Sequence, residues 1–347
     1  MRPKGAPPRL EFEVFEPKTD SQVPSGTISR AKAICPCCNV VMPPERVRVL
    51  LQQQNGGADT QFDSAGKRIG GALLLAVALL KHGLPGRHYR TATIGDYRRI
   101  FEAQKTLPRI LTATLPIEQP LPTMTGTFNA PLYGMAKWGL LFTSRQKVAL
   151  LSLARLISNL KDETERELCS FALSKLADLS NSLCMWEPIA ECPRHLFGRQ
   201  AIPMSWDFAE GVPIGESSGS FSVCVENTAT GVIAASLPKN DNAATVQVAD
   251  ATVAQLPAES ADVWFTDPPY YFAVPYADLS DFFFVWLKCA MPSHPLLRDP
   301  FDSSNPLTPK KQELCEMAHW DMHGMHGKTK RSLSTAWRKP SLRAGSV

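Results

Sequence analysis

The chain has 347 residues, of which 44% are hydrophobic and 20% are charged, as is ordinary for a globular protein. The net charge of +4 permits a nucleic-acid partner without arguing for one. The longest apolar run, Ile69 to Leu80, has twelve residues, too short to span a bilayer, and no secretion signal opens the chain. Nine Cys, three of them in "CPCC", indicate reduced thiols or metal ligands rather than a disulfide framework. We therefore expect a cytoplasmic protein with no membrane partner.

The first predicted unit covers residues 1–56. Its alternating stretch "LEFEVFE", Leu10 to Glu16, is typical of a β-strand. It is followed by a turn that holds the three cysteines of "CPCC", which we call the cysteine turn, and then by a Pro-Pro pair and a short helix.

The second predicted unit, residues 57–200, has mainly helical periodicity. The run Ile69 to Leu80 predicts a buried helix, "GDYRRIFEAQKTL" a second one, and the segment after Thr143 and Ser144, either of which could cap it, a longer helical region. In that region apolar residues recur at helical spacing: Leu150, Leu153, Ala154, Ile157 and Leu160.

The third predicted unit, residues 201–300, has an α/β pattern, and residues 301–347 follow as a loop and a basic tail. One short strand ends at Asp250, and an apolar strand, Val263 to Phe265, is followed by Asp267. Acids at the carboxyl ends of two strands occupy the edge where open α/β sheets bind ligands. Asp250 could equally be a turn acid or a helix cap. A helix should follow, with Leu279, Phe282, Phe283, Trp286 and Leu287 in the core.

The tetrapeptide Asp267-Pro268-Pro269-Tyr270 suits chemistry on the exocyclic amine of a nucleobase. The Asp267 carboxylate would accept a hydrogen bond from the amine, and the Pro268 carbonyl, held extended by Pro269, would accept another. Both contacts would localise the nitrogen lone pair. Tyr270 offers a face on which a flipped base can stack. A plain turn is the alternative, because Asp and Pro both form turns.

These residues carry a resemblance to a known family. Asp-Pro-Pro-Tyr is the signature of S-adenosylmethionine-dependent DNA methyltransferases acting on adenine N6 or cytosine N4. The longer stretches "TDPPYYFAVPYADLSDFFFVWLK", "CPCCNVVMPPERV" and "FGRQAIPMSWDFAE" resemble bacterial adenine-specific DNA methylases with a zinc-ribbon insertion. The resemblance implies a partial Rossmann-like methyltransferase core with a mainly helical insertion and a half zinc ribbon, DNA as partner, and a cofactor-adenine contact at Asp250.

Two features of that family are incomplete in this chain. Cys35 and Cys38 form one metal-binding knuckle, and no second knuckle occurs, so zinc at these residues competes with free thiols. No Phe-x-Gly-x-Gly loop is present to hold S-adenosylmethionine, and the pair Gly70 and Gly71, before an apolar run, favours a packing role or the start of a helix. We expect a truncated member, and a separately encoded N-terminal fragment is a candidate partner. The alternative function is an inactive remnant or a nucleic-acid-binding fragment.

Overall fold

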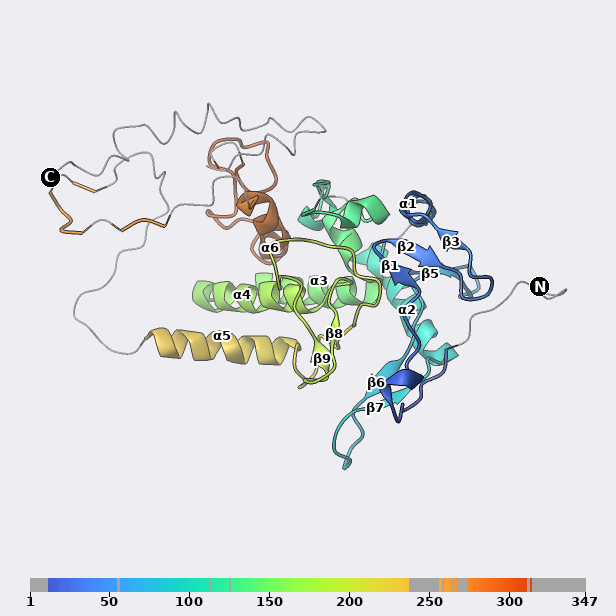
Figure 1. The fold of residues 1–347 in the computed structure, drawn as a ribbon. Helices are drawn as coiled ribbons and strands as arrows, with labels where there is room; N and C mark the ends of the chain where they lie inside the picture. The colour runs from blue at the N-terminus through green and yellow to red at the C-terminus, as the bar shows by residue number, and fades with distance from the viewer. Residues whose placement is uncertain are drawn as a thin grey trace.

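The computed structural model has a mixed α/β fold (Figure 1) and describes residues 12–54, 57–112, 114–124, 126–236, 256–257, 259–263, 265–267, 274–310 and 313. Within these ranges the α-helices are α1 Pro44–Gln52, α2 Ile94–Thr106, α3 Ser144–Ser158, α4 Glu163–Leu179, α5 Phe221–Ala235 and α6 Tyr276–Ala290. The strands are β1 Ile28–Ser29, β2 Lys32–Ile34, β3 Val41–Met42, β4 Thr60–Phe62, β5 Arg68–Gly71, β6 Val77–Leu79, β7 His88–Arg90, β8 Trp186–Glu187 and β9 Cys192–Pro193.

The strands form small antiparallel sheets. One has the order β1-β2-β3, and the other three are the pairs β4-β5, β6-β7 and β8-β9. The coarse prediction of an α/β protein is therefore confirmed. No Rossmann-like sheet and no zinc ribbon occur in the described ranges, and the strand predicted to end at Asp250 lies outside them.

The helices α3, α4 and α6 pack on one another, and α5 runs alongside α4 (Figure 1). The prediction of helical structure after Thr143 is confirmed, and Thr143 is the residue that caps α3. Its side chain accepts a hydrogen bond from the Gln146 amide, and the Gln146 side chain accepts one from the Thr143 amide. The α4 helix begins in a similar way, because the Asp162 carboxylate accepts from the Glu165 amide at 2.8 Å.

The core is built around the aromatic side chains of α6. The prediction for that helix is confirmed for Leu279, Phe282 and Trp286, whereas Phe283 and Leu287 are partly buried. Phe282 and Trp286 are fully buried. The Phe282 ring stacks on Phe142 at 5.9 Å between centroids and meets the edge of Trp138 at 6.4 Å. Ring pairs at these separations add to the stabilisation that burial provides. The apolar spacing of α6 thus determines which of its faces turns inward.

The helix predicted for Ile69 to Leu80 is wrong. The structure has β5 and β6 there, with exposed residues between them that include Leu75. Gly71 adopts φ +68°, and a Cβ on it would lie 2.3 Å from the Asp59 carbonyl oxygen. Only glycine fits so close to another backbone, so the Gly70-Gly71 pair ends a hairpin instead of starting a helix.

Two predicted strands are also absent from the described residues. Residues 12–16 of "LEFEVFE" have no strand structure. Val263 and Phe265 belong to no strand, and they are 81% and 92% exposed. Both segments have the residue types of strands, but no strand in the described ranges pairs with them. No helix in the described ranges is long and apolar enough to cross a membrane.

We predict that Phe282→Ala destabilises the fold by about 3 to 5 kcal/mol, because it removes a buried ring and leaves a cavity. Urea unfolding followed by tryptophan fluorescence measures the change. Phe171→Ala is the matched control, since Phe171 on α4 is 55% exposed and should change stability by less than about 0.5 kcal/mol. Equal effects of the two substitutions would contradict the placement of α6 in the core.

Candidate functional site

A groove of about 460 Å³ opens between α6 and the loop that follows β9. The loop contributes residues 197–200 to one wall. The other wall consists of Val274, Tyr276, Leu279, Ser280 and Phe283. The volume of the groove lies within the range of small-molecule sites, which is roughly 300 to 1,000 Å³.

The loop wall is fixed by Asp178 in the last turn of α4. The carboxylate of Asp178 accepts a hydrogen bond from the Phe197 amide at 3.2 Å, and its carbonyl accepts one from the Leu196 amide at 2.9 Å. The Phe197 ring then packs against Phe282 and Phe283, with centroids 5.2 and 5.1 Å apart. The end of one helix and the aromatic face of another therefore determine where the loop lies.

The helix wall begins where α6 begins. The Leu279 amide donates to the Pro275 carbonyl at 3.0 Å, and the Ser280 hydroxyl donates to the Tyr276 carbonyl at 2.7 Å. The Ala277 amide, which has no acceptor within the helix, donates to the Glu313 carboxylate at 2.8 Å. These bonds hold the first turn of α6, and Tyr276 with it, at the edge of the groove.

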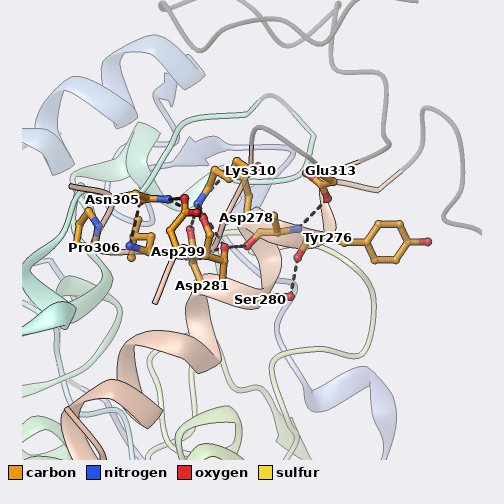
Figure 2. A network of polar contacts seen from close by, with 12 residues as sticks. Tyr276, Asp278, Ser280, Asp281, Asp299, Asn305, Pro306, Lys310 and Glu313 are labelled. Atoms are coloured by element: carbon orange, nitrogen blue, oxygen red, sulfur yellow. Dashed lines mark hydrogen bonds and ion pairs between the residues drawn. The ribbon is translucent and has the colours of Figure 1, made fainter. Parts of the chain in front are cut away.

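A buried polar network ties the segment after α6 back to that first turn (Figure 2). Asp281 is 0% exposed, and its carboxylate lies 2.6 Å from the Lys310 ammonium. The same carboxylate accepts from the Thr308 amide at 2.9 Å. Asp278 lies 3.9 Å from Lys310. A carboxylate this deeply buried needs such partners, because transfer from water costs several kcal/mol.

Asp299 extends the network into the following loop. It accepts hydrogen bonds from the Phe301 amide at 2.9 Å and from the Asn305 side chain at 2.8 Å. Burial by itself raises the pKa of Asp299, but hydrogen bonds from Asn305, Phe301 and Asp302 together lower the pKa below its ordinary value. Asp299 is thus stabilised as a carboxylate, and the loop folds around it.

The residues predicted for amine chemistry are not assembled by the described structure. Asp267 is exposed and lies in no strand. Pro268, Pro269, Tyr270 and Asp250 lie outside the described residues. Their roles stay predictions. In sequence, Tyr270 precedes Val274, a residue of the groove wall, by four positions.

Cys35 and Cys38 do come together, in the turn between β2 and β3. The Cys35 amide donates to the Val40 carbonyl at 3.0 Å, and the Asn39 amide donates to the Cys35 carbonyl at 2.8 Å. The amides of Cys37 and Cys38 point at the Cys35 sulfur and lower the pKa of its thiol. Such a turn suits a soft metal such as zinc, yet no group of three or more possible metal ligands occurs among the described residues.

Gly70 and Gly71 lie at the end of the β4-β5 hairpin. The Gly70-Gly71 pair cannot hold the cofactor, because the Asp59 backbone fills the space beside Gly71. We therefore assign no described residue to the cofactor.

Several residues of the groove were not singled out from the sequence. Arg199 and Gln200 lie in "FGRQ", and this stretch by itself does not indicate a binding site. The fold places it opposite α6, where it forms one wall of the groove. The network had one signal: Asp278 and Asp281 lie three positions apart in a helix rich in apolar residues, so the two acids share one face of it. Searches of protein-family models, curated proteins and solved structures find no match to this chain.

We predict that Lys310→Met destabilises the fold by about 3 kcal/mol, because it leaves the Asp281 charge buried without its cation. Urea unfolding measures the loss. Lys161→Met, at an exposed lysine with no ion pair in the described ranges, should change stability by less than about 0.5 kcal/mol. Adding Asp281→Asn to Lys310→Met removes the uncompensated charge and should recover part of the loss. A Lys310→Met variant as stable as the parent would contradict the network.

We predict that the purified chain holds well under one zinc per molecule, because one knuckle supplies fewer than four ligands. Elemental analysis after gel filtration measures the content. Stoichiometric zinc that disappears in Cys35→Ser, but stays in Cys192→Ser, would show that other residues complete the site.

Proposed function

We propose that this protein is an S-adenosylmethionine-dependent methyltransferase that acts on the exocyclic amine of a nucleobase in DNA, with adenine N6 as the expected acceptor. The observation that carries the proposal is the position of the Asp267–Tyr270 tetrapeptide, directly before the wall of an aromatic groove. Four residues span at most about 14 Å, so covalent geometry tethers Tyr270 to Val274 at the groove.

On this proposal Asp267 acts on the amine. An exocyclic amine is a weak nucleophile, because its lone pair is delocalised into the ring. A carboxylate and the Pro268 carbonyl that accept its two N–H groups favour tetrahedral nitrogen and localise that pair. The amine then has to lose one proton, and Asp267 is the proposed acceptor.

S-adenosylmethionine, when bound, supplies an electrophilic methyl group. Asp250 is the proposed contact to the adenine of the cofactor. The sequence has no glycine-rich loop for the methionine part, so a partner polypeptide is the proposed source of that loop. A partial Rossmann-like core and a half zinc ribbon at Cys35 and Cys38 are the finer fold proposal.

A second candidate function is a nucleic-acid-binding fragment without catalysis. The observation that favours it is the exposure of Val263, Phe265 and Asp267, none of which lies in a strand. An amine-activating carboxylate has to be held rigidly at a defined distance from the reacting nitrogen, since small misplacements cost large factors in rate.

We predict that Asp267→Ala lowers methyl transfer at least about 100-fold in a preparation that shows the activity, while the affinity for DNA stays nearly unchanged. Incorporation of radiolabelled methyl groups into mixed-sequence DNA measures the rate, and fluorescence anisotropy measures binding. Asp262→Ala, at an exposed acid five positions upstream, is the matched control.

Near wild-type turnover in Asp267→Ala would contradict the proposal that Asp267 acts on the amine. DNA binding with no transfer by the parent chain, with or without a partner fragment, would favour the second candidate.

A further inference from the structure

We propose that the groove between residues 197–200 and α6 binds one unstacked nucleotide of single-stranded DNA, with the base against Tyr276 and the phosphate at Arg199. The choice of nucleic acid rests on the proposed function. The groove itself rests on its geometry alone, and nothing in the methyl-transfer chemistry requires Arg199 or Gln200 to take part.

Aromatic side chains from the two walls of the groove contact each other. Phe197 comes from the loop and Phe283 from α6, and their rings are tilted by 36° at a centroid distance of 5.1 Å. Tyr276 lines the same groove, is 38% exposed, and its ring points away from the polar network (Figure 2). In the described ranges, nothing hydrogen-bonds to its hydroxyl. An exposed ring at the edge of an aromatic groove is a surface on which a base can stack.

The volume fits one nucleotide. About 460 Å³ has room for one nucleotide. Val274 and Leu279 add apolar surface to the groove. A base can reach this surface only when it is not paired and stacked in a duplex, which favours a single strand over an intact duplex.

The polar groups are placed for a phosphate and a base edge. The side chains of Arg199 and Gln200 are exposed at the loop wall and make no hydrogen bond or ion pair within the described part of the chain. Among the described residues that line the groove, Arg199 is the one that carries a charge, so the phosphate belongs at Arg199. The Gln200 amide can both donate to and accept from a base edge.

The test measures binding of the full chain to a short fluorescein-labelled single-stranded oligodeoxynucleotide, followed by anisotropy at several salt concentrations. Tyr276→Ala should weaken binding about 5- to 150-fold, the range for loss of one stacked base. Tyr276→Phe should keep most of the affinity. Phe171→Ala, at an exposed ring on α4, is the control that should have no effect.

Arg199→Ala should weaken binding and reduce the slope of log affinity against log salt by about 0.7, the value for one phosphate contact on a single strand. Arg155→Ala, at an exposed arginine on α3, should leave that slope unchanged. A duplex of the same sequence should bind more weakly than the single strand.

Three outcomes would overturn the proposal. The parent chain does not bind the oligonucleotide, or Tyr276→Ala and Arg199→Ala leave the affinity unchanged. In the third, Tyr276→Ala changes the sedimentation of the protein and not its affinity for the oligonucleotide. The last would assign the groove to a second copy of the chain. None of these outcomes depends on methyl transfer. If the methyltransferase proposal fails, the nucleotide-binding proposal for the groove can still hold. If the groove proposal fails, the role of Asp267 is still tested by the methyl-transfer assay.

Discussion

Burial of the aromatic face of α6 is the interaction on which the described structure depends. Phe282 is enclosed by Phe142, Trp138 and the loop ring Phe197, so a single side chain joins α6, the start of α3 and the loop after β9. Burying a ring of this size contributes roughly 1.5 to 3 kcal/mol from burial alone. The same packing forms the groove, because Phe197 and Phe283 pack against the core and also line the groove.

The acidic residues of α6 bind the segment that follows the helix. The partners of the buried Asp281 carboxylate, Lys310 and Thr308, come from the segment that follows the helix. Their bonds bring that segment back over the first turn of α6, where Glu313 accepts from Ala277. One helix thus has three roles: an apolar face for the core, an acidic face for the returning chain, and a first turn for the groove.

The predicted amine-chemistry motif and the groove adjoin in the sequence, at residues 267–274. The sequence motif predicts amine chemistry at Asp267 to Tyr270, and the structure places an aromatic groove beginning at Val274. On the proposed function, a base that has left the DNA duplex would bind in this groove. The exposed Val263 and Phe265 supply the opposing observation, because nothing described holds Asp267 rigidly.

The sequence by itself determined the helices α2, α3, α4 and α6, since their apolar residues recur at helical spacing, and the caps of α2, α3 and α4 are local. It also determined the cysteine turn, where neighbouring residues set the geometry. Only the tertiary structure decided that Ile69 to Leu80 forms strands, because the close approach of Gly71 to Asp59 is not encoded in the run itself. The groove and the Asp281–Lys310 pair were likewise beyond the sequence, since their residues lie 29 or more positions apart and meet only through packing.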